Sequence, residues 1–290
     1  MDLDTLKRSP LGFLLANAKL AIYTVFGFFK FYLKPRARVV LVLSSMRSGS
    51  TLLKSLMAQG EDVSLLDEFH FIPYANHNKY FFYYLVSRLS DKPIIVLKKP
   101  FNNVAAHFPL YGKTPLSDVS NIVLYRHPYE TLISLKAIQR RKQYGVFNDE
   151  QCVAYWADTY EAVFNNIDPG RETLFVRYEY LTEQTEYVTR RIFEFIGSAH
   201  VGGAERYGDY GWKAGQDDDS DKIRSRTIHK AVAAGPDVDP GLYLALQNSH
   251  RVRELLERLD CCAAGQGMIS GALDHSGAQP NSVLPALSAQ

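Results

Sequence analysis

The sequence predicts an α/β fold: a single domain with a central parallel sheet and helices on both faces. Four short runs rich in Val, Ile and Leu are typical of strands that are covered on both faces. They lie at residues 39–43, 94–97, 122–125 and 174–176. The stretches between them leave room for helices, which is the pattern of parallel strands joined by helical crossovers. A chain of 290 residues that is 46% hydrophobic can bury one large core of this kind.

The helices of this fold are expected from the helical spacing of apolar residues. They are expected at residues 51–59, 129–141, 150–165, 185–196 and 242–259. Gly197 directly follows one of these stretches, as a glycine at a helix C-terminus does. After residue 259 the chain is small and polar and cannot bury much surface, so a disordered tail is expected. The expected boundaries are an N-terminal segment at 1–38, the α/β domain at 39–260 and the tail at 261–290.

The composition argues against several classes of partner. Lys and Arg total 33 and Asp and Glu total 31, so the net charge of +2 predicts no nucleic-acid partner. The three cysteines are too few and too irregularly spaced for a disulfide framework or a zinc site. We therefore expect no metal and a reducing compartment, the cytoplasm.

The N-terminal segment predicts a peripheral contact with a membrane surface. Residues 11–34 are mostly apolar, and a helical wheel gathers their polar residues on roughly one half of the circumference. Basic residues flank this amphipathic stretch and favour an anionic leaflet. They are Lys7, Arg8, Lys34, Arg36 and Arg38. A signal anchor and a helix packed on the domain are the alternatives.

The junction between the first strand and the first helix has the residues of an anion-binding loop. They are Arg47, Ser48, Gly49, Ser50, Thr51 and Leu52. Gly49 lets the backbone turn closely, so that successive N–H groups and the N-terminus of the following helix face a phosphate. Arg47 adds a full positive charge. A typical Walker loop is excluded because no lysine follows Gly49, so this loop is only P-loop-like.

A second phosphate-binding pattern begins at Arg126, directly after the run at 122–125. Pro128 suits the first turn of a helix, and Ser134 lies about two turns further along. Arg126 and Ser134 are therefore expected to reach one phosphate. The arginine offers forked, charged donors to the phosphate oxygens, and the serine hydroxyl adds a neutral one.

These motifs resemble those of sulfotransferases that use 3′-phosphoadenosine 5′-phosphosulfate (PAPS), in the carbohydrate-type or bacterial branch. The R-S-G-S-T loop is similar to the family's 5′-phosphosulfate loop, and R-x-P followed by Ser134 is similar to its 3′-phosphate motif. The segment Arg177-Tyr178-Glu179 resembles the family's R-Y-E-D-L segment, in which the tyrosine lies near the adenine. The resemblance implies that PAPS is the co-substrate and that Tyr178 contacts its base.

Two catalytic cations are expected, one from the resemblance and one from its place in the predicted sheet. Arg47 stands where many members carry a lysine, so we assign it an electrostatic role at the bridging and sulfuryl oxygens. Lys98 directly follows the strand at 94–97, at the carboxyl end of the sheet where open α/β sheets bind ligands. Neighbouring side chains leave a strand in opposite directions, so either Lys98 or Lys99 supplies the second cation, and we choose Lys98.

The general base is assigned from the same resemblance. Glu68 is similar to the glutamate that many carbohydrate-type members place after the first helix. Cytosolic small-molecule members instead use a histidine in a lysine-rich segment, and the corresponding segment at 96–101 has no histidine. Glu68 is therefore the expected base. The alternatives are His70, His107 and Asp67.

The expected function is transfer of a sulfuryl group from PAPS to a hydroxyl or amine of an acceptor. A glycan, a glycolipid or another small hydroxylated molecule is the expected acceptor. One alternative is a nucleotide-dependent kinase with a degenerate phosphate loop. Another is a catalytically inactive, nucleotide-binding scaffold at a membrane surface.

Overall fold

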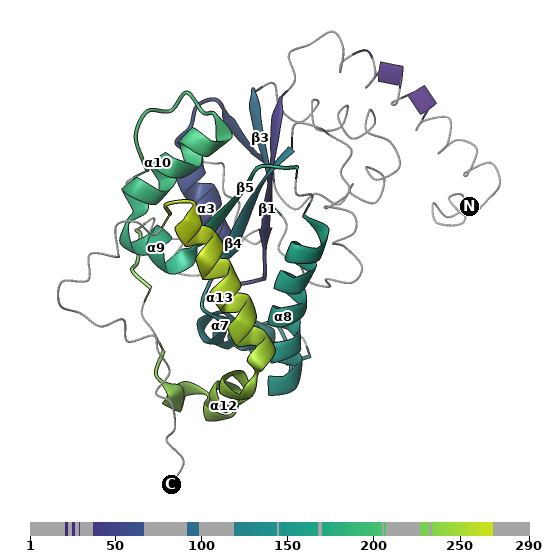
Figure 1. Cartoon of the computed structure of the whole chain (residues 1–290), viewed down its shortest axis with the longest axis vertical. Coiled ribbons are helices and arrows are strands. Elements are labelled where there is room, and N and C mark those ends of the chain that lie inside the picture. Colours follow the sequence, from purple (N-terminus) through teal and green to yellow (C-terminus); the bar gives the residue numbers. More distant parts are fainter. Residues whose placement is uncertain are drawn as a thin grey trace.

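A parallel sheet forms the centre of the molecule (Figure 1). The computed structural model describes residues 21, 22, 25, 26, 29, 37–66, 92–98, 119–143, 145–167, 170–204, 206, 227–231 and 234–268. Among these residues the sheet has five strands, in the order β2-β3-β1-β4-β5. They are β1 (Arg38–Ser44), β2 (Val63–Leu66), β3 (Ile94–Lys98), β4 (Val119–Tyr125) and β5 (Thr173–Arg177). Every neighbouring pair runs parallel, so the predicted α/β fold is confirmed.

Helices cover the sheet on two sides (Figure 1). The helices between the first strand and residue 196 are α3 (Ser50–Met57), α7 (Pro128–Arg141), α8 (Asp149–Asn166), α9 (Tyr178–Glu183) and α10 (Thr185–Ile196). In Figure 1, α3 and α10 lie on one side of the strands and α8 lies on the other. The described C-terminal part contains the short 3₁₀ helix η1 (Pro236–Val238), α12 (Pro240–Asn248) and α13 (His250–Gly265). Of these, α13 packs against β5 and α8.

The C-terminal helices differ from the single helix that we expected at 242–259. The chain breaks at Ser249, whose side chain accepts a hydrogen bond from the Val252 N–H and so begins α13 as its N-cap. Apolar spacing continues across this break and therefore conceals it. The helix also continues past the expected boundary at 260, because Ala263 and Met268 are buried in the core. The described part of the domain therefore reaches residue 268.

The order of the strands creates a topological switch point beside β1. From β1 the chain builds β2 and β3 on one side, and it later builds β4 and β5 on the other side. The carboxyl ends of β1 and β4 therefore form a topological switch point, where open α/β sheets bind their ligands. The apolar side chains of residues 39–43, 94–97 and 122–125 are buried, which fixes the positions of the strands around this switch point.

Residues 1–36 are described at only five positions, all of which are exposed. Ile22, Val25, Phe26 and Phe29 belong to this group, and each exposes slightly more than half of its surface. They are spaced by three and four residues, so they share one face of a helix. Within the described parts of the chain, no helix has both the length and the apolar character needed to cross a membrane.

Candidate functional site

The predicted motifs meet at the carboxyl end of the sheet. Parallel register pairs Ser44 of β1 with Leu124 of β4, so both strands end side by side. On the other side of β1, Val42 pairs with Lys98, the last residue of β3. The loop after β1, the arginine after β4 and the lysine of β3 are therefore neighbours, although they lie far apart in the sequence.

The β1–α3 loop, residues 45–49, turns sharply before helix α3. Arg47 and Gly49 both have positive φ angles, 69° and 91°. Gly49 is the N-cap of α3 and supplies no side chain to cap it, while its carbonyl accepts from the Leu53 N–H at 3.1 Å. The N–H groups of the first turn, at residues 50–52, have no acceptor within the helix. The loop therefore presents an uncapped helix N-terminus, which suits an anion.

The side chain of Tyr178 joins the β1–α3 loop to Arg126. A Cβ atom added to Gly49 would overlap the ring of Tyr178, so this close approach requires glycine. The guanidinium carbon of Arg126 lies 4.7 Å from the centre of the same ring, a cation–π contact. The structure thus brings together three residues that the sequence assigned to one nucleotide.

Arg126 itself retains donor capacity. Its side chain is 15% exposed, and one terminal nitrogen lies 3.5 Å from Glu130 Oε2. Its Nε is buried and has no hydrogen-bond partner among the described residues. A buried donor without an acceptor is costly unless a ligand supplies one. Arg126 therefore has the properties of an anion-binding group.

Ser134 makes a contact that we did not expect. Its hydroxyl accepts a hydrogen bond from Arg47 Nε at 3.0 Å. The left-handed backbone of Arg47 directs this side chain across to α7, which explains the contact. The serine therefore lies between the two motifs and contacts the arginine of the first loop.

The other predicted loop residues make mainly internal contacts. Lys98 Nζ donates to Thr51 Oγ1 at 2.8 Å, which joins the end of β3 to the first turn of α3. The Ser48 hydroxyl is buried and donates to the carbonyl of Ser45 at 3.0 Å. Leu52 is part of the core. Ser48 and Leu52 can therefore serve a ligand only through their backbone N–H groups, whereas Ser50 also lies at the start of α3.

A network of charged residues supports the Arg126 side of the site and was not predicted. Glu179 accepts from the His127 N–H at 3.0 Å and from Arg177 Nε at 3.1 Å. Arg177 also donates to both oxygens of Asp260, at 2.9 and 3.0 Å, and Tyr125 donates to the same carboxylate at 2.7 Å. Burial, and then the Asp260 charge, raises the pKa of the Tyr125 hydroxyl, so the phenol stays neutral. Two members of this network, Arg177 and Glu179, belong to a motif that we noted in the sequence. Asp260 lies too far away in the sequence for any local motif to indicate it.

The expected base cannot be placed. Glu68 lies outside the described residues, as do its alternatives Asp67, His70 and His107 and also Lys99. Leu66, the last residue of β2, pairs with Leu97 and so lies at the carboxyl edge of the sheet. Across the described parts of the chain, no group of three His, Cys, Asp or Glu side chains is arranged to hold a metal ion.

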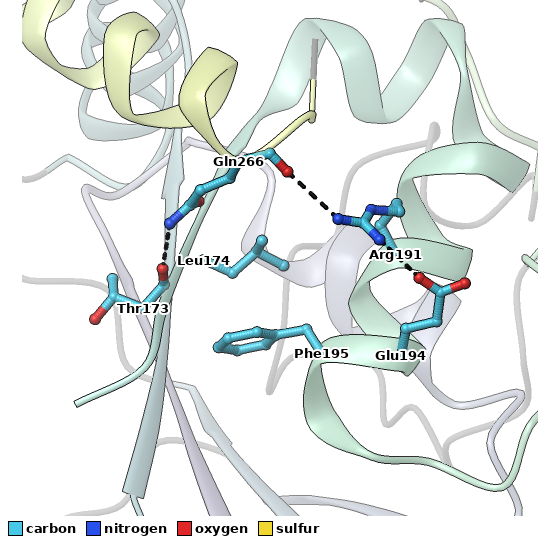
Figure 2. A pocket seen from close by; sticks show the side chains of 6 residues that line it. All are labelled: Thr173, Leu174, Arg191, Glu194, Phe195 and Gln266. Atoms are coloured by element: carbon cyan, nitrogen blue, oxygen red, sulfur yellow. Dashed lines mark hydrogen bonds and ion pairs between the residues drawn. The ribbon is translucent and has the colours of Figure 1, made fainter. Parts of the chain in front are cut away.

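A shallow hollow lies elsewhere and is not part of this site. It has a volume of about 400 Å³ and is lined by Thr173, Leu174, Arg191, Glu194, Phe195 and Gln266. Thr173 begins β5, so the hollow lies at the opposite end of this strand from Arg177. In Figure 2 the Gln266 side chain reaches Thr173, where its Nε2 donates to the strand carbonyl at 2.6 Å. Gln266 thus occupies part of the free edge of the sheet.

Comparisons with known proteins agree with this arrangement. The sequence profile of the sulfotransferase domain family matches residues 37–207, which include every described site residue. The solved sulfotransferase domain from the curacin biosynthetic pathway is 16% identical, with a TM-score of 0.54 over 77% of this chain and 97% of that domain. The sulfotransferase domain of the Synechococcus PCC 7002 olefin synthase is also 16% identical, with a TM-score of 0.50 over 79% and 96%. At this identity the two structures establish the fold alone. No curated protein sequence matches the chain.

Proposed function

This chain belongs to the sulfotransferase family and is a sulfotransferase, and from that premise we propose that it transfers the sulfuryl group of PAPS to a glycan or glycolipid. The acceptor atom is a hydroxyl oxygen or an amine nitrogen. Arg126 carries the proposal for the donor, because its buried Nε lacks a partner among the described residues and lies beside the β1–α3 loop. The ring of Tyr178 contacts both Gly49 of the β1–α3 loop and Arg126. The loop and Arg126 can therefore hold the two ends of one bisphosphorylated nucleotide.

The 3′-phosphate of PAPS is proposed to bind Arg126. Glu130 pairs with this arginine, but the 3.5 Å separation makes a weak ion pair that a dianionic phosphate can replace. Ser134 lies within reach of both motifs, because Arg47 holds it at 3.0 Å. Tyr178 is proposed to contact the adenine, with its ring already fixed between Gly49 and Arg126.

The 5′-phosphosulfate is proposed to lie against the start of α3. Its N–H groups and helix dipole supply partial positive charge there. Arg47 and Lys98 add two full charges, and Lys98 is held at the first turn of α3 by Thr51. These groups stabilise the negative charge that develops on the departing 5′-phosphate as sulfur is transferred.

The acceptor is proposed to attack sulfur opposite the leaving phosphate. A bond forms between the acceptor oxygen and sulfur while the bond from sulfur to the 5′-phosphate oxygen breaks, and Glu68 takes the acceptor's proton. The two described carboxylates beside Arg126 are already engaged, Glu130 with Ala234 N–H and Glu179 with His127 N–H. Their engagement supports a base from the segment after β2, at the same edge of the sheet.

An assay with PAPS that is labelled at sulfur tests this function. The protein is incubated with glycans, glycolipids and phenols, with and without membranes. We expect labelled glycan or glycolipid and an equal amount of adenosine 3′,5′-bisphosphate. Transfer to phenols alone would overturn the acceptor class, and absence of transfer to every acceptor would overturn the use of PAPS. Magnesium-dependent turnover of ATP would instead support the kinase alternative.

We also propose that residues 11–34 bring this cytoplasmic enzyme to an anionic membrane surface. The exposed apolar face formed by Ile22, Val25, Phe26 and Phe29 supports this location. Cosedimentation with vesicles that contain anionic lipid is expected, and replacement of Phe26 and Phe29 by serine should weaken it. Equal sedimentation with neutral vesicles would contradict the charge component of this proposal, and equal sedimentation of the double variant would contradict the apolar component.

A further inference from the structure

Helix α8 sends two buried tyrosine hydroxyls to the β1–α3 loop. Tyr155 exposes 8% of its surface and Tyr160 exposes none. Both belong to a helix to which we assigned no functional role from the sequence. Buried hydroxyl groups need hydrogen-bond partners, and here these partners belong to the loop that is proposed to bind the donor.

Tyr160 connects the loop to the neighbouring strand. Its hydroxyl donates to the carbonyl of Leu124 in β4 at 3.0 Å. The hydroxyls of Ser45 and Ser48 each lie 3.3 Å from the same oxygen. Ser48 donates to the Ser45 carbonyl, which closes a network of hydroxyl groups on both sides of Arg47. This network leaves the ends of the loop little freedom to move relative to β4.

Tyr155 holds the residue immediately before Arg47. Its hydroxyl accepts a hydrogen bond from the Met46 N–H at 2.7 Å. Removal of this hydroxyl would leave a partly buried N–H without that acceptor, and the backbone would have to move to find water. A movement of the Met46 peptide changes the direction in which the next residue projects.

Arg47 adopts a backbone conformation that needs such support. Its φ angle of 69° lies in the left-handed region, which residues with a side chain rarely adopt. A strained residue of this kind persists when the surrounding structure holds it from several directions. Tyr155 holds the residue before Arg47, and the Tyr160 network holds the residues on either side of it.

Both tyrosines act as neutral groups. Burial raises the pKa of Tyr155 and also that of Tyr160. The phenols therefore place no negative charge beside a loop that presents N–H groups and an arginine to an anion. Their contribution is directional hydrogen bonding alone.

We propose that Tyr155 and Tyr160 are positioning residues that hold the β1–α3 loop in its anion-binding shape and so set the direction of Arg47. The inference rests on the proposed function, since the anion is taken to be the 5′-phosphosulfate. It predicts that these two hydroxyls matter more for the 5′ end of the donor than for its 3′-phosphate, because neither tyrosine has a hydrogen bond to Arg126 among the described contacts.

A binding experiment with two nucleotides distinguishes the site for the 5′ end of the donor from the site for its 3′-phosphate. Adenosine 3′,5′-bisphosphate needs both phosphate sites, whereas adenosine 3′-monophosphate needs only the site at Arg126. Calorimetric titration of Tyr155→Phe should give about tenfold weaker binding of the bisphosphate, as expected from loss of one buried hydrogen bond. Affinity for the monophosphate should stay within about twofold of wild type. Tyr160→Phe should show the same difference between the two nucleotides.

Tyr187→Phe is the matched control. Its hydroxyl also donates one partly buried hydrogen bond, to the Gly267 carbonyl at 2.9 Å, but it has no contact with the loop in the described structure. Neither nucleotide should bind Tyr187→Phe differently from wild type. Unchanged binding of the bisphosphate by Tyr155→Phe and Tyr160→Phe, or an equal loss for both nucleotides, would overturn the inference.

A measurement on the wild-type protein remains informative if the variants do not fold. The Met46 amide should exchange its hydrogen about a hundredfold more slowly than an unprotected amide, because Tyr155 binds it. Exchange at the unprotected rate in the folded enzyme would overturn the inference. Wild-type protein that binds neither nucleotide would contradict the proposed function itself. The exchange rate of the Met46 amide does not depend on nucleotide binding, so it tests the role of Tyr155 separately from the proposed function.

Discussion

Arg126 is held firmly in position, yet its charge is only weakly compensated. The ring of Tyr178 supports one face of the guanidinium, Glu130 is 3.5 Å away, and Nε lacks a partner among the described residues. A well-compensated arginine would lose as much on ligand binding as it gains. This arginine instead gains an acceptor when a phosphate arrives.

Replacement of Arg126 by alanine should therefore weaken nucleotide binding. We expect affinity for adenosine 3′,5′-bisphosphate to fall by about 10- to 100-fold, the range for loss of hydrogen bonds to a charged group. Arg140→Ala is the control, because Arg140 is exposed near the other end of α7. Calorimetric titration measures both variants. Equal affinity of Arg126→Ala and wild type would remove Arg126 from the site.

Glu68→Gln should separate chemistry from binding. If Glu68 takes the acceptor's proton, turnover should fall by about 10²- to 10⁴-fold, while affinity for the bisphosphate should hardly change. Glu61→Gln, at an exposed position on the turn before β2, should retain normal turnover. Initial rates with saturating PAPS give the comparison. Near-normal turnover of Glu68→Gln would transfer the assignment to His70, His107 or Asp67.

The residues proposed to bind phosphate were easier to find in the sequence than the residues that support them. Arg47, Gly49 and Arg126 belong to short local motifs, in which the residue type and the spacing both carry the chemistry. The supporting residues Tyr160 and Asp260 reach the site only through tertiary packing, and no local sequence motif marks them. The hydrogen bond from Arg47 to Ser134 was not predicted either, because nothing local indicates that Arg47 adopts a left-handed backbone and reaches α7.

At the scale of elements, residues 234–239 fasten the C-terminal helices to the start of α7. Glu130 accepts from the Ala234 N–H, and the Tyr129 hydroxyl accepts from the Asp239 N–H at 3.0 Å. Lys136 of α7 then binds Asp239 at 2.8 Å and Asp149 of α8 at 2.5 Å. One cation thus joins the beginnings of α8 and α12, next to the helix that follows Arg126.

The charge of Asp239 should contribute to stability in a pH-dependent way. Burial alone would raise its pKa, but hydrogen bonds from Lys136 and from the Leu242 N–H outweigh burial and hold the pKa below 3.8. A depressed carboxyl pKa stabilises the fold above the unfolded pKa, and this contribution disappears as the pH falls through the folded value. Asp239→Asn keeps an N-cap acceptor for α12 but removes the charge.

We therefore expect Asp239→Asn to lower the free energy of unfolding by about 1 to 2 kcal/mol near neutral pH. The difference from wild type should shrink below about pH 4, where the wild-type carboxylate gains its proton. Urea unfolding at both pH values measures it. Asp237→Asn, at an exposed position of η1, should show neither effect. A difference that is independent of pH would assign the loss to packing.

Strands with continuous apolar runs were predicted well. A strand with an interrupted run and a break between two helices were not predicted. The runs at 39–43 and 122–125 are buried on both faces, so local pattern and tertiary position agree. Strand β2 was not predicted, because a serine interrupts its four residues (Val-Ser-Leu-Leu) and leaves no continuous apolar run. The break at Ser249 depends on a cap within an apolar pattern that continues through it.

At the scale of the whole molecule, the site joins three distant parts of the chain. The β1–α3 loop, Arg126 and Tyr178 follow three different strands, and parallel pairing alone brings these strands' ends together. A ligand that binds all three parts binds only the folded protein. Its binding free energy therefore adds to the stability of the entire domain.

Adenosine 3′,5′-bisphosphate should for this reason raise the melting temperature. At about one hundred times its Kd, the expected stabilisation is about 2.7 kcal/mol, which corresponds to several degrees for a domain of this size. Differential scanning fluorimetry measures this shift. The same concentration should shift Arg126→Ala much less, because one of the three parts no longer binds, whereas Arg140→Ala should follow wild type. A larger shift with magnesium and ATP than with the bisphosphate would contradict a site built for a 3′-phosphate, since ATP lacks the group that Arg126 is proposed to hold.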